Sequence, residues 1–297
     1  MDVFVAGGGP AGLATVIAAR RHGLSVLVVD GAVPPIDKPC GEGLMPDGVE
    51  ALHNLGITIP HGEAQPFRGI RFVSGKREAE TVFPREIAHG IRHTTLHRIM
   101  VEHAAASGVS MCWRAAVTGL HPEGALVAGD LVRARWVVGA DGAQSRVRYW
   151  ARLDAHQHKN VRFAFRRHYR MEPLTDFMEF HWGERCQLYV TAVGPGEICV
   201  AMTSDSPKMR LEDALRGFPE LSERLRDAEH ASSERGAITV SRRLRRVYRR
   251  AYGSGRRRFR WSRCHYRRGS LPGFPASRAA GGMLARQRSG SLSGRTS

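Results

Sequence analysis

The sequence predicts a mixed α/β fold, in which a mostly parallel sheet with helices is joined to an antiparallel sheet. Three observations predict it. A glycine-rich turn separates two short apolar runs in residues 3–30, another apolar run ends at Asp141, and short runs rich in Val, Phe, Tyr and Thr fill residues 161–205. The chain has 297 residues, 42% of them hydrophobic and 25% charged, which allows one large or two small domains.

The first element is a strand, turn, helix and second strand over residues 3–30, VFVAGGGPAGLATVIAARRHGLSVLVVD. The run VFVA is typical of a strand that is buried on both faces. Gly7, Gly9 and Gly12 follow with the G-x-G-x-x-G spacing, Gly23 ends the helix, and Asp30 ends the second strand about 20 residues beyond the glycines. This order predicts a dinucleotide site, and a glycine-rich turn without a ligand is the alternative.

Each residue type in this motif has a physical reason. Gly7 permits the tight turn, Gly9 lets the backbone approach a pyrophosphate, and Gly12 lets the helix pack closely on the strand. The helix N-terminus offers N–H groups and a positive dipole end to the phosphates. Asp30 would accept hydrogen bonds from a ribose diol.

Two later stretches indicate which dinucleotide cofactor the chain binds. Residues 37–48 read DKPCGEGLMPDG, and residues 136–148 read WVVGADGAQSRVR, an apolar strand followed by a polar turn and a helix start. Together with the glycine turn, they resemble the flavin-dependent oxidoreductases of the para-hydroxybenzoate hydroxylase fold. KPCGEGLMPDG looks like the segment near the flavin ring in the geranylgeranyl reductase-like branch. The resemblance covers residues 1–249.

The resemblance implies a Rossmann-like FAD-binding domain at residues 1–154, with a returning segment at 236–249, and an antiparallel-sheet substrate domain at 155–235. It implies FAD as the cofactor and NAD(P)H as a transient electron donor. The alternatives are a helix N-cap for Asp141, a surface ion pair for Arg92 and a small packed thiol for Cys40. The residues expected to bind the cofactor are Gly7, Gly9, Pro10, Ala11, Gly12, Asp30, Lys38, Cys40, Gly41, Arg92, Val117, Asp141 and Gly142.

The strand-like runs of residues 161–205 predict the antiparallel sheet that covers the flavin in the resembled fold. A helix broken at Pro219 follows. LYVTAVG stands where geranylgeranyl reductases carry an aromatic Y-x-W-x-F-P stretch, and the Trp-rich signature of flavin halogenases is missing, so neither specific activity is favoured. His168, His181 and Trp182 could line a pocket, although sheet packing is the alternative for each.

Several classes of site and location are not indicated. The five cysteines, Cys40, Cys112, Cys186, Cys199 and Cys264, form no C-x-x-C pair, so neither a zinc site nor a disulfide framework is expected, and no metal is predicted. The sequence shows no apolar run long enough to span a bilayer and no charged leader. We therefore expect a cytoplasmic protein that acts on a small-molecule substrate, and its oligomeric state is not predicted.

The net charge of +17 belongs entirely to the end of the chain. Residues 241–297 hold 17 Arg and no acid, which leaves 28 basic and 28 acidic residues in residues 1–240. A basic nucleic-acid-binding arm is one interpretation of this arginine-rich stretch. The neutral body of the chain argues against it, so no nucleic-acid partner is expected.

A shifted reading frame is the favoured interpretation of residues 250–297. Codon choices exist for residues 255–278 that, moved by one nucleotide, spell VGDASGGVDAITGEGLCLAFRQA. This is the missing Gly-Asp and G-E-G motif of the resembled family, at the expected place. The tail is therefore predicted to be out of frame and to be disordered, because like charges and clustered Gly and Ser disfavour a packed core.

The sequence thus predicts an FAD-dependent oxidoreductase. An NAD(P)H-using monooxygenase on a small organic substrate is favoured, and a flavin-dependent reductase of an isoprenoid-like double bond is the alternative. The flavin would supply the chemistry while the protein supplies position and electrostatics. A truncated, non-catalytic product or a basic nucleic-acid-binding protein is the alternative from another class. No catalytic acid or base is predicted.

Overall fold

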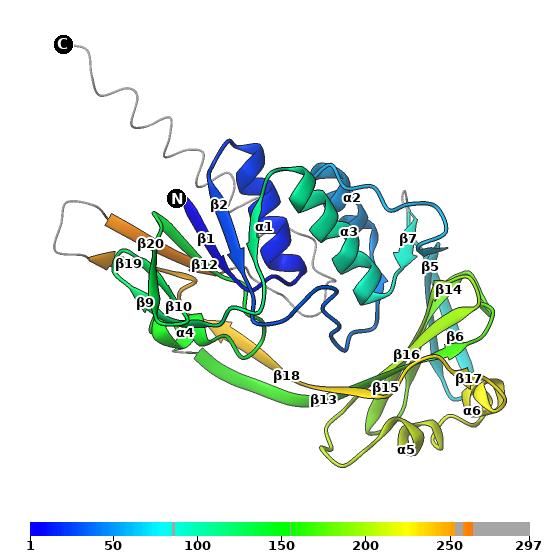
Figure 1. Cartoon of the computed structure of the whole chain (residues 1–297). Helices are drawn as coiled ribbons and strands as arrows, with labels where there is room; N and C mark the ends of the chain where they lie inside the picture. The colour runs from blue at the N-terminus through cyan, green and yellow to red at the C-terminus, as the bar shows by residue number, and fades with distance from the viewer. Residues whose placement is uncertain (85–86, 155, 253–257, 264–297) are drawn as a thin grey trace, which may run out of the picture.

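The computed structural model describes residues 1–84, 87–154, 156–252 and 258–263. Figure 1 shows a sheet with helices packed against it, linked by two long strands to a second sheet. The helices are α1 Pro10–Arg21, α2 Pro46–Asn54, α3 His93–Ala106, α4 Arg146–Trp150, α5 Leu211–Leu215 and α6 Pro219–Leu225. The α/β class with a parallel and an antiparallel sheet is confirmed.

The first sheet has six strands in the order β19-β20-β12-β1-β2-β8. Strand β1 pairs in parallel with both β12 and β2, β2 pairs in parallel with β8, and β20 pairs in parallel with β12. These strands are β1 Val3–Ala6, β2 Val26–Val29, β8 Ser110–Cys112, β12 Trp136–Gly139, β19 Tyr248–Tyr252 and β20 Arg258–Arg263.

Strand β1 is apolar throughout because both faces of this sheet are covered. Val3 and Val5 pack against α1 and α3 on one face. Phe4 and Ala6 pack on the other face against a small antiparallel sheet. Its strands are β9 Val117–His121, β10 Gly124–Val127 and β11 Asp130–Arg133.

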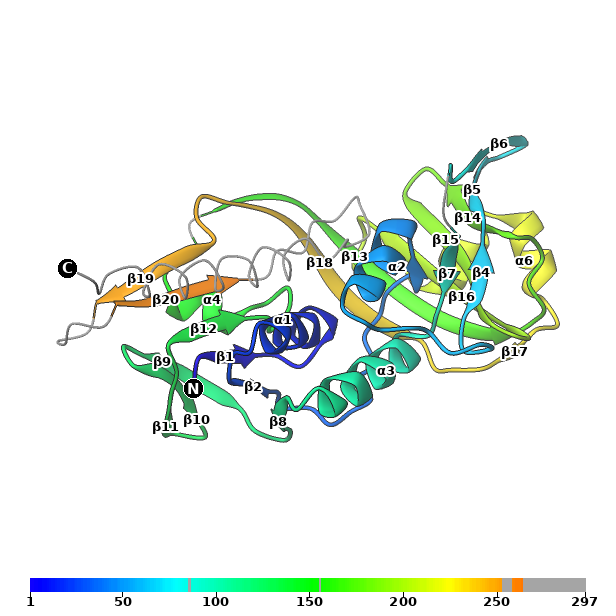
Figure 2. The same ribbon diagram turned by 90° about the horizontal axis from the view of Figure 1, so that it is seen from above.

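The second large sheet has eight strands and is mostly antiparallel. The long strands β13 and β18 pair with each other and run between the two lobes (Figure 2). The strands are β5 Gly69–Ser74, β6 Arg77–Val82, β13 His156–Arg170, β14 Phe177–Trp182, β15 Cys186–Gly194, β16 Glu197–Ser204, β17 Glu229–His230 and β18 Arg235–Leu244. A three-stranded sheet lies against β15 and α2 and contains β3 Gly43–Leu44, β4 Gln65–Phe67 and β7 Ala88–Gly90.

Helices α5 and α6 cover one face of the eight-stranded sheet, with Leu211, Leu215 and Leu221 packed on Leu188 and Val200. The predicted break at Pro219 is present, because α6 begins there. Proline is favoured in the first turn of a helix, where its missing N–H costs nothing. Met178 and Tyr189 of this sheet pack instead on Phe67 and Ala88 of the three-stranded sheet.

Two segments cross the expected domain boundaries. Strands β5 and β6 belong to residues 1–154, yet they hydrogen-bond to each other at the edge of the eight-stranded sheet, where β5 pairs with β14. The returning segment at 236–249 lies mostly in β18, which pairs with β13, and only β19 reaches the six-stranded sheet. Each sheet therefore draws on distant parts of the chain.

The expectation of no packed structure after residue 250 is wrong for the described part of the tail. Strand β20 pairs with β12 in the register Trp136 to Arg260, and β19 pairs with β20. Backbone ladders depend little on side-chain type, and the free edge of β12 offers unpaired N–H and C=O groups. The sequence RFRW also alternates polar and aromatic residues, which is typical of a strand. Residues 253–257 and 264–297, which the same expectation covers, lie outside the described residues.

Candidate functional site

The glycine turn lies where β1 ends and α1 begins, and its positions are glycine for different physical reasons. Gly7 has φ +107°, and a Cβ there would lie 2.4 Å from the carbonyl oxygen of Ala140. A Cβ at Gly12 would lie 1.8 Å from the carbonyl oxygen of Gly7. Both positions therefore exclude side chains because the backbones pack too closely. At Gly9 the backbone is extended, and among the described residues a Cβ would find only the Nζ of Lys38, 3.8 Å away.

Lys38 joins the glycine turn to the second predicted motif. Its Nζ lies 3.9 Å from the Cβ position of Gly142 and 3.8 Å from that of Gly9. Gly142 has φ +86° and follows β12. The ammonium group therefore faces both turns at the carboxyl ends of two neighbouring strands. Ligands of doubly wound sheets bind at this edge.

Asp30 holds the turn through its own carboxylate. Oδ2 accepts the Gly8 N–H at 2.8 Å, and Oδ1 accepts the Ala32 N–H at 2.8 Å. Trp113 packs over Gly8, where a Cβ would meet its ring at 2.3 Å. Asp30 thus lies beside the glycine turn, as the sequence predicts, and Trp113 explains why the position between Gly7 and Gly9 is also glycine.

Asp141 caps the next helix. Its Oδ2 accepts the N–H groups of Arg146 at 2.7 Å and Val147 at 3.1 Å, at the start of α4. Its Oδ1 is buried and finds no hydrogen-bond partner in the described part of the chain. The helix-capping role is therefore present, and one carboxylate oxygen stays available.

His97 was not singled out from the sequence. Its side chain is completely buried on α3, and its Nε2 lies 2.8 Å from the Gly8 carbonyl oxygen. Its Nδ1 lies 3.3 Å from the backbone nitrogen of Ile36. The position of His97 one helical turn after His93 was the available signal, because residues four apart share one face of a helix.

The segment Asp37–Leu44 crosses from the glycine turn to the eight-stranded sheet. Two of its carboxylates contact side chains of β13. Asp37 forms an ion pair with Arg166, and Glu42 Oε2 lies 2.6 Å from His168 Nε2. Glu42 Oε1 also accepts the N–H of His93, the first residue of α3. Glu42 therefore joins this segment to the sheet and to α3.

The hydrogen bonds around His168 fix its tautomer. A guanidinium only donates, and Arg166 lies 3.0 Å from Nδ1, so Nδ1 accepts and the proton is on Nε2, where it is donated to Glu42. Glu42, His168 and Cys199 have ligand atoms within 4.8 Å of one another. A metal ion would need the Nε2 lone pair and would meet the guanidinium, so this cluster fits a hydrogen-bonded network better than a metal site.

Cys40 and Gly41 lie where this segment meets the sheet. Cys199 Sγ lies 3.7 Å from the Cys40 carbonyl oxygen, and the Cβ position of Gly41 lies 3.9 Å from Met178. Burial, followed by the nearby Glu42 carboxylate, raises the pKa of the Cys40 thiol to about 12. A thiol with so high a pKa is a poor nucleophile at neutral pH.

Two predicted residues do not come to the glycine turn. Arg92 pairs with Glu197 at the start of β16, and its Nε finds no further partner among the described residues. Val117 begins β9 and packs with Phe4 and Ala6 on the covered face of the sheet. Pro10 and Ala11 occupy the first turn of α1, beside the other members of the predicted set.

The three residues that could line a pocket, His168, His181 and Trp182, have different surroundings. His168 belongs to the buried network described above. His181 lies on the helix-covered side, 2.7 Å from Glu179 and edge-on to Phe218 of the α5–α6 connection. Trp182 packs on Phe180 and Phe72 and is 47% exposed. Sheet packing, the alternative interpretation, describes His181.

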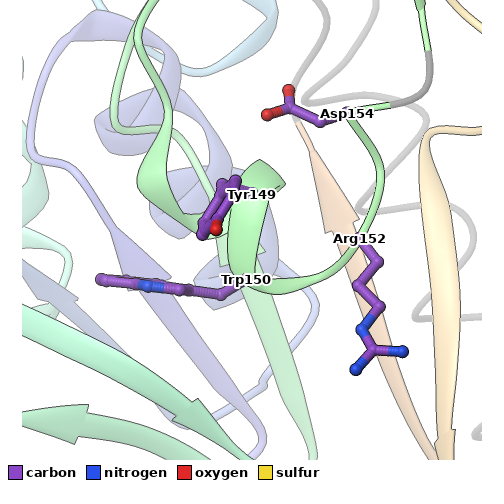
Figure 3. A pocket seen from close by; sticks show the side chains of 4 residues that line it. All are labelled: Tyr149, Trp150, Arg152 and Asp154. Atoms are coloured by element: carbon purple, nitrogen blue, oxygen red, sulfur yellow. The ribbon is translucent and has the colours of Figure 1, made fainter.

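A cavity of about 490 Å³ lies at the other end of α4 (Figure 3). It is lined by Tyr149, Trp150, Arg152 and Asp154. Tyr149 and Trp150 come from the helix, and the other two from the loop that follows it. None of the predicted cofactor residues lines it, since Asp141 lies at the opposite end of α4.

A family model described as an FAD binding domain matches residues 1–184. The chain belongs to this FAD-binding family. The match includes β1, the glycine turn, β12 and Asp141, together with the Lys38 segment. It confirms the flavin-dependent resemblance and FAD as the cofactor. None of the described helices has the length and apolarity to cross a bilayer.

The relatives of this FAD-binding chain include one protein named as a reductase and one named as a monooxygenase. It is 34% identical over 155 residues to a menaquinone reductase of Mycobacterium tuberculosis, covering 48% of this chain and 38% of that protein. It is 30% identical over 161 residues to a rifampicin monooxygenase of Streptomyces venezuelae, covering 50% and 33%. The matched part thus spans less than half of either relative.

A solved structure extends the likeness of fold over nearly the whole chain. A flavoprotein/dehydrogenase from Cytophaga hutchinsonii aligns with a TM-score of 0.80 at 19% identity, covering 98% of this chain and 79% of that one. At this identity the likeness concerns the fold alone.

The residues of the glycine turn fit the dinucleotide. The space beside Gly9 and Gly142 is bounded by a lysine ammonium, and the N-terminus of α1 carries no side-chain cap. A positive charge and a helix N-terminus are what a pyrophosphate requires. Asp30 lies next to them at the end of β2, where a ribose diol would be bound.

Proposed function

We propose that this FAD-binding chain is an FAD-dependent oxidoreductase that takes electrons from NAD(P)H and acts as a monooxygenase on a small organic substrate. The observation that carries the proposal is the position of the Lys38 ammonium between the Gly9 and Gly142 turns. The likeness to a rifampicin monooxygenase supports the reaction type. When bound, the flavin would supply the redox chemistry.

The proposed binding residues have distinct tasks. Lys38 neutralises the pyrophosphate, Gly9 leaves room for it, and the first turn of α1 at Pro10 and Ala11 donates to it. Asp30 binds the ribose. Asp141 and Gly142 approach from the neighbouring strand end, and Cys40 and Gly41 carry the backbone past the ring. Arg92 and Val117 have the least support, since Arg92 is paired with Glu197 and Val117 packs with Phe4 and Ala6 under the six-stranded sheet.

Reduction of an isoprenoid-like double bond is the second candidate. The KPCGEG segment and the likeness to a menaquinone reductase favour it. In either case we propose that residues 1–154 hold the cofactor and that the antiparallel sheet of residues 155–235 forms the substrate side. Strands β5 and β6 then contribute to that side as well.

The first test is a titration of the purified chain with FAD, followed by NADH and NADPH. Gly9→Leu is the informative variant, because its side chain would fill the pyrophosphate space while the extended backbone at residue 9 accepts it without strain. We expect the variant to fold normally and to lose FAD binding. Equal FAD stoichiometry in both proteins would contradict the assignment.

The second test separates the two reactions. With FAD bound, the chain is supplied with NAD(P)H, oxygen, and either a phenol or a quinone that carries an unsaturated isoprenoid chain, and the mass of that chain is followed. Monooxygenation adds one oxygen atom to the product and consumes dioxygen, whereas reduction adds two hydrogen atoms and proceeds without it. Salt-sensitive DNA binding without any flavin binding would instead support the nucleic-acid alternative.

A further inference from the structure

His97 is a buried titratable group that is not among the residues proposed to contact FAD. It lies between the glycine turn and the segment that carries Lys38. Nδ1 accepts the Ile36 N–H, so in this arrangement the ring is neutral and its proton is on Nε2, where it is donated to the Gly8 carbonyl. One ring therefore ties the glycine turn to a residue two positions before Lys38.

We propose that His97 is a positioning residue that holds the Lys38 segment against the glycine turn, and that its protonation releases FAD. The inference rests on the proposed FAD site. A proton can be added only at Nδ1, and it would set two donors, Nδ1–H and the Ile36 N–H, against each other. Because the side chain is completely buried, water cannot solvate the new charge, so the segment must move. Lys38 moves with it.

The surroundings of His97 favour the neutral ring. Burial is the largest effect and lowers the pKa of His97. The hydrogen bond to the Gly8 carbonyl and the charge of Asp30 raise it, and His93 and Lys38 lower it. Two aromatic rings lie beside it: the Trp113 ring is edge-on with its centroid 6.2 Å away, and the His93 ring is stacked at 6.4 Å. A bound pyrophosphate would attract an imidazolium, but Lys38 already supplies a cation there, and the proton enters at the edge of the ring that faces Ile36.

His93 is the natural control. It lies one turn earlier on α3, and its Nδ1 lies 2.8 Å from the carbonyl oxygen of the same residue, Ile36. A carbonyl only accepts, so Nδ1 of His93 carries the proton and Nε2 can take a second one without breaking this hydrogen bond. Its protonation therefore leaves the Lys38 segment in place.

The test is the dissociation constant of FAD, measured by flavin fluorescence between about pH 8 and about pH 4.5. Because burial lowers the pKa of His97, the step should lie below the ordinary histidine value of about 6.5. In the unmodified chain we expect affinity to fall by up to roughly tenfold per pH unit as His97 takes up one proton. His97→Gln keeps a donor for the Gly8 carbonyl but does not titrate, so this step should disappear while binding at the higher pH persists. His97→Leu should bind weakly at every pH, and His93→Gln should keep the step.

An unchanged pH step in His97→Gln would overturn the inference and leave the FAD site standing. Failure of the unmodified chain to bind FAD at any pH would overturn the proposed function and this inference with it. Amide exchange without FAD gives an independent readout. On acidification, after correction for intrinsic rates, the Ile36 amide should lose protection in the unmodified chain and keep it in His97→Gln, whereas the Gly8 amide, which donates to Asp30, serves as the internal reference. Equal protection in both would also overturn the inference.

Discussion

Nε2 of His168 lies 2.6 Å from Oε2 of Glu42, and neither side chain exposes more than 1% of its surface. Glu42 is also one of the non-glycine residues with positive φ, at +56°. Such a backbone conformation persists where the surroundings enforce it. The buried pair and the N–H of His93 supply that enforcement and fix the segment that passes between the two lobes.

Replacing His168 with Leu should destabilise the chain strongly. The Glu42 carboxylate would stay buried without its imidazole partner, and removing one member of a buried pair costs about 3–5 kcal/mol. Glu42→Gln keeps an acceptor for the Nε2–H and should cost less. The measurement is the free energy of unfolding in urea. Arg170→Ala, which breaks an exposed pair with Glu229, should change it by less than about 1 kcal/mol. Equal effects of His168→Leu and Arg170→Ala would contradict the role of the pair.

Lys38→Met should weaken FAD binding without affecting the fold. The ammonium faces the Gly9 and Gly142 turns and is exposed, so it contributes charge to the ligand and little to the core. A hydrogen bond to a charged group contributes about 1.5–3 kcal/mol, which corresponds to a loss of roughly 10- to 150-fold in affinity. Lys38→Arg should recover most of it. Lys76→Met, in the turn between β5 and β6, is the control that should bind FAD normally.

The sequence predicted what depends on local pattern. Gly7, Gly12 and Asp30 follow from the order of strand, turn, helix and strand. Gly12 packs on the Gly7 carbonyl and Asp30 accepts the Gly8 N–H within the same unit, and Gly7 has the positive φ of the tight turn. The roles of His97 and of the Glu42–His168 pair were not predicted, because their partners lie 61 to 126 residues away in the chain. Trp113 was not predicted either, because its ring fills the place where a side chain of Gly8 would lie. Such contacts leave no periodic signal. The placement of β5 and β6 at the edge of the eight-stranded sheet was missed for the same reason.

Glu179 should make the stability of the chain depend on acid pH. Burial alone would raise its pKa, but the hydrogen bonds from His181 and Arg224 hold it near 2, below the ordinary value of 4.5. A carboxyl group with a lowered folded-state pKa contributes stability that is fully present above pH 4.5 and is lost as the pH falls through about 2. The shift corresponds to roughly 3 kcal/mol. In Glu179→Gln the decline of unfolding free energy below pH 4.5 should be shallower, and parallel curves for the two proteins would contradict the assignment.

Cys40 and Cys199 should resist alkylation in the folded chain. The Cys40 pKa is raised to about 12, and burial raises that of Cys199 as well, so almost no thiolate exists at neutral pH. Iodoacetamide followed by peptide mass spectrometry should show both unmodified under native conditions and both modified in denaturant. Rapid native alkylation of Cys40 would instead support an accessible, reactive thiol beside the flavin.

The arginine-rich end of the chain gives the last prediction. In the shifted reading, residues 255–278 spell a Gly-Asp motif followed by G-E-G and an amphipathic helix. The structure places β20 parallel to β12. Parallel neighbours end at the same sheet edge, so a Gly-Asp turn after a strand in this position would face the space between Gly7 and Asp141. The chain as written lacks that turn and should hold FAD mainly from its adenosine side.

Restoring the shifted frame from residue 249 should therefore raise FAD affinity by at least roughly tenfold, which is the contribution of one good polar contact of about 1.4 kcal/mol. It should also add helical signal in circular dichroism and raise the melting temperature. A chain that stops at residue 249 is the control, because it removes the like charges without supplying the motif. If that control gained as much as the restored chain, relief of charge repulsion would explain the change. If the nucleotide sequence over codons 245–260 does not permit the shifted reading, or if the chain as written binds FAD stoichiometrically and tightly, the frameshift explanation is wrong, and the arginine-rich strand beside β12 must be explained as part of the protein.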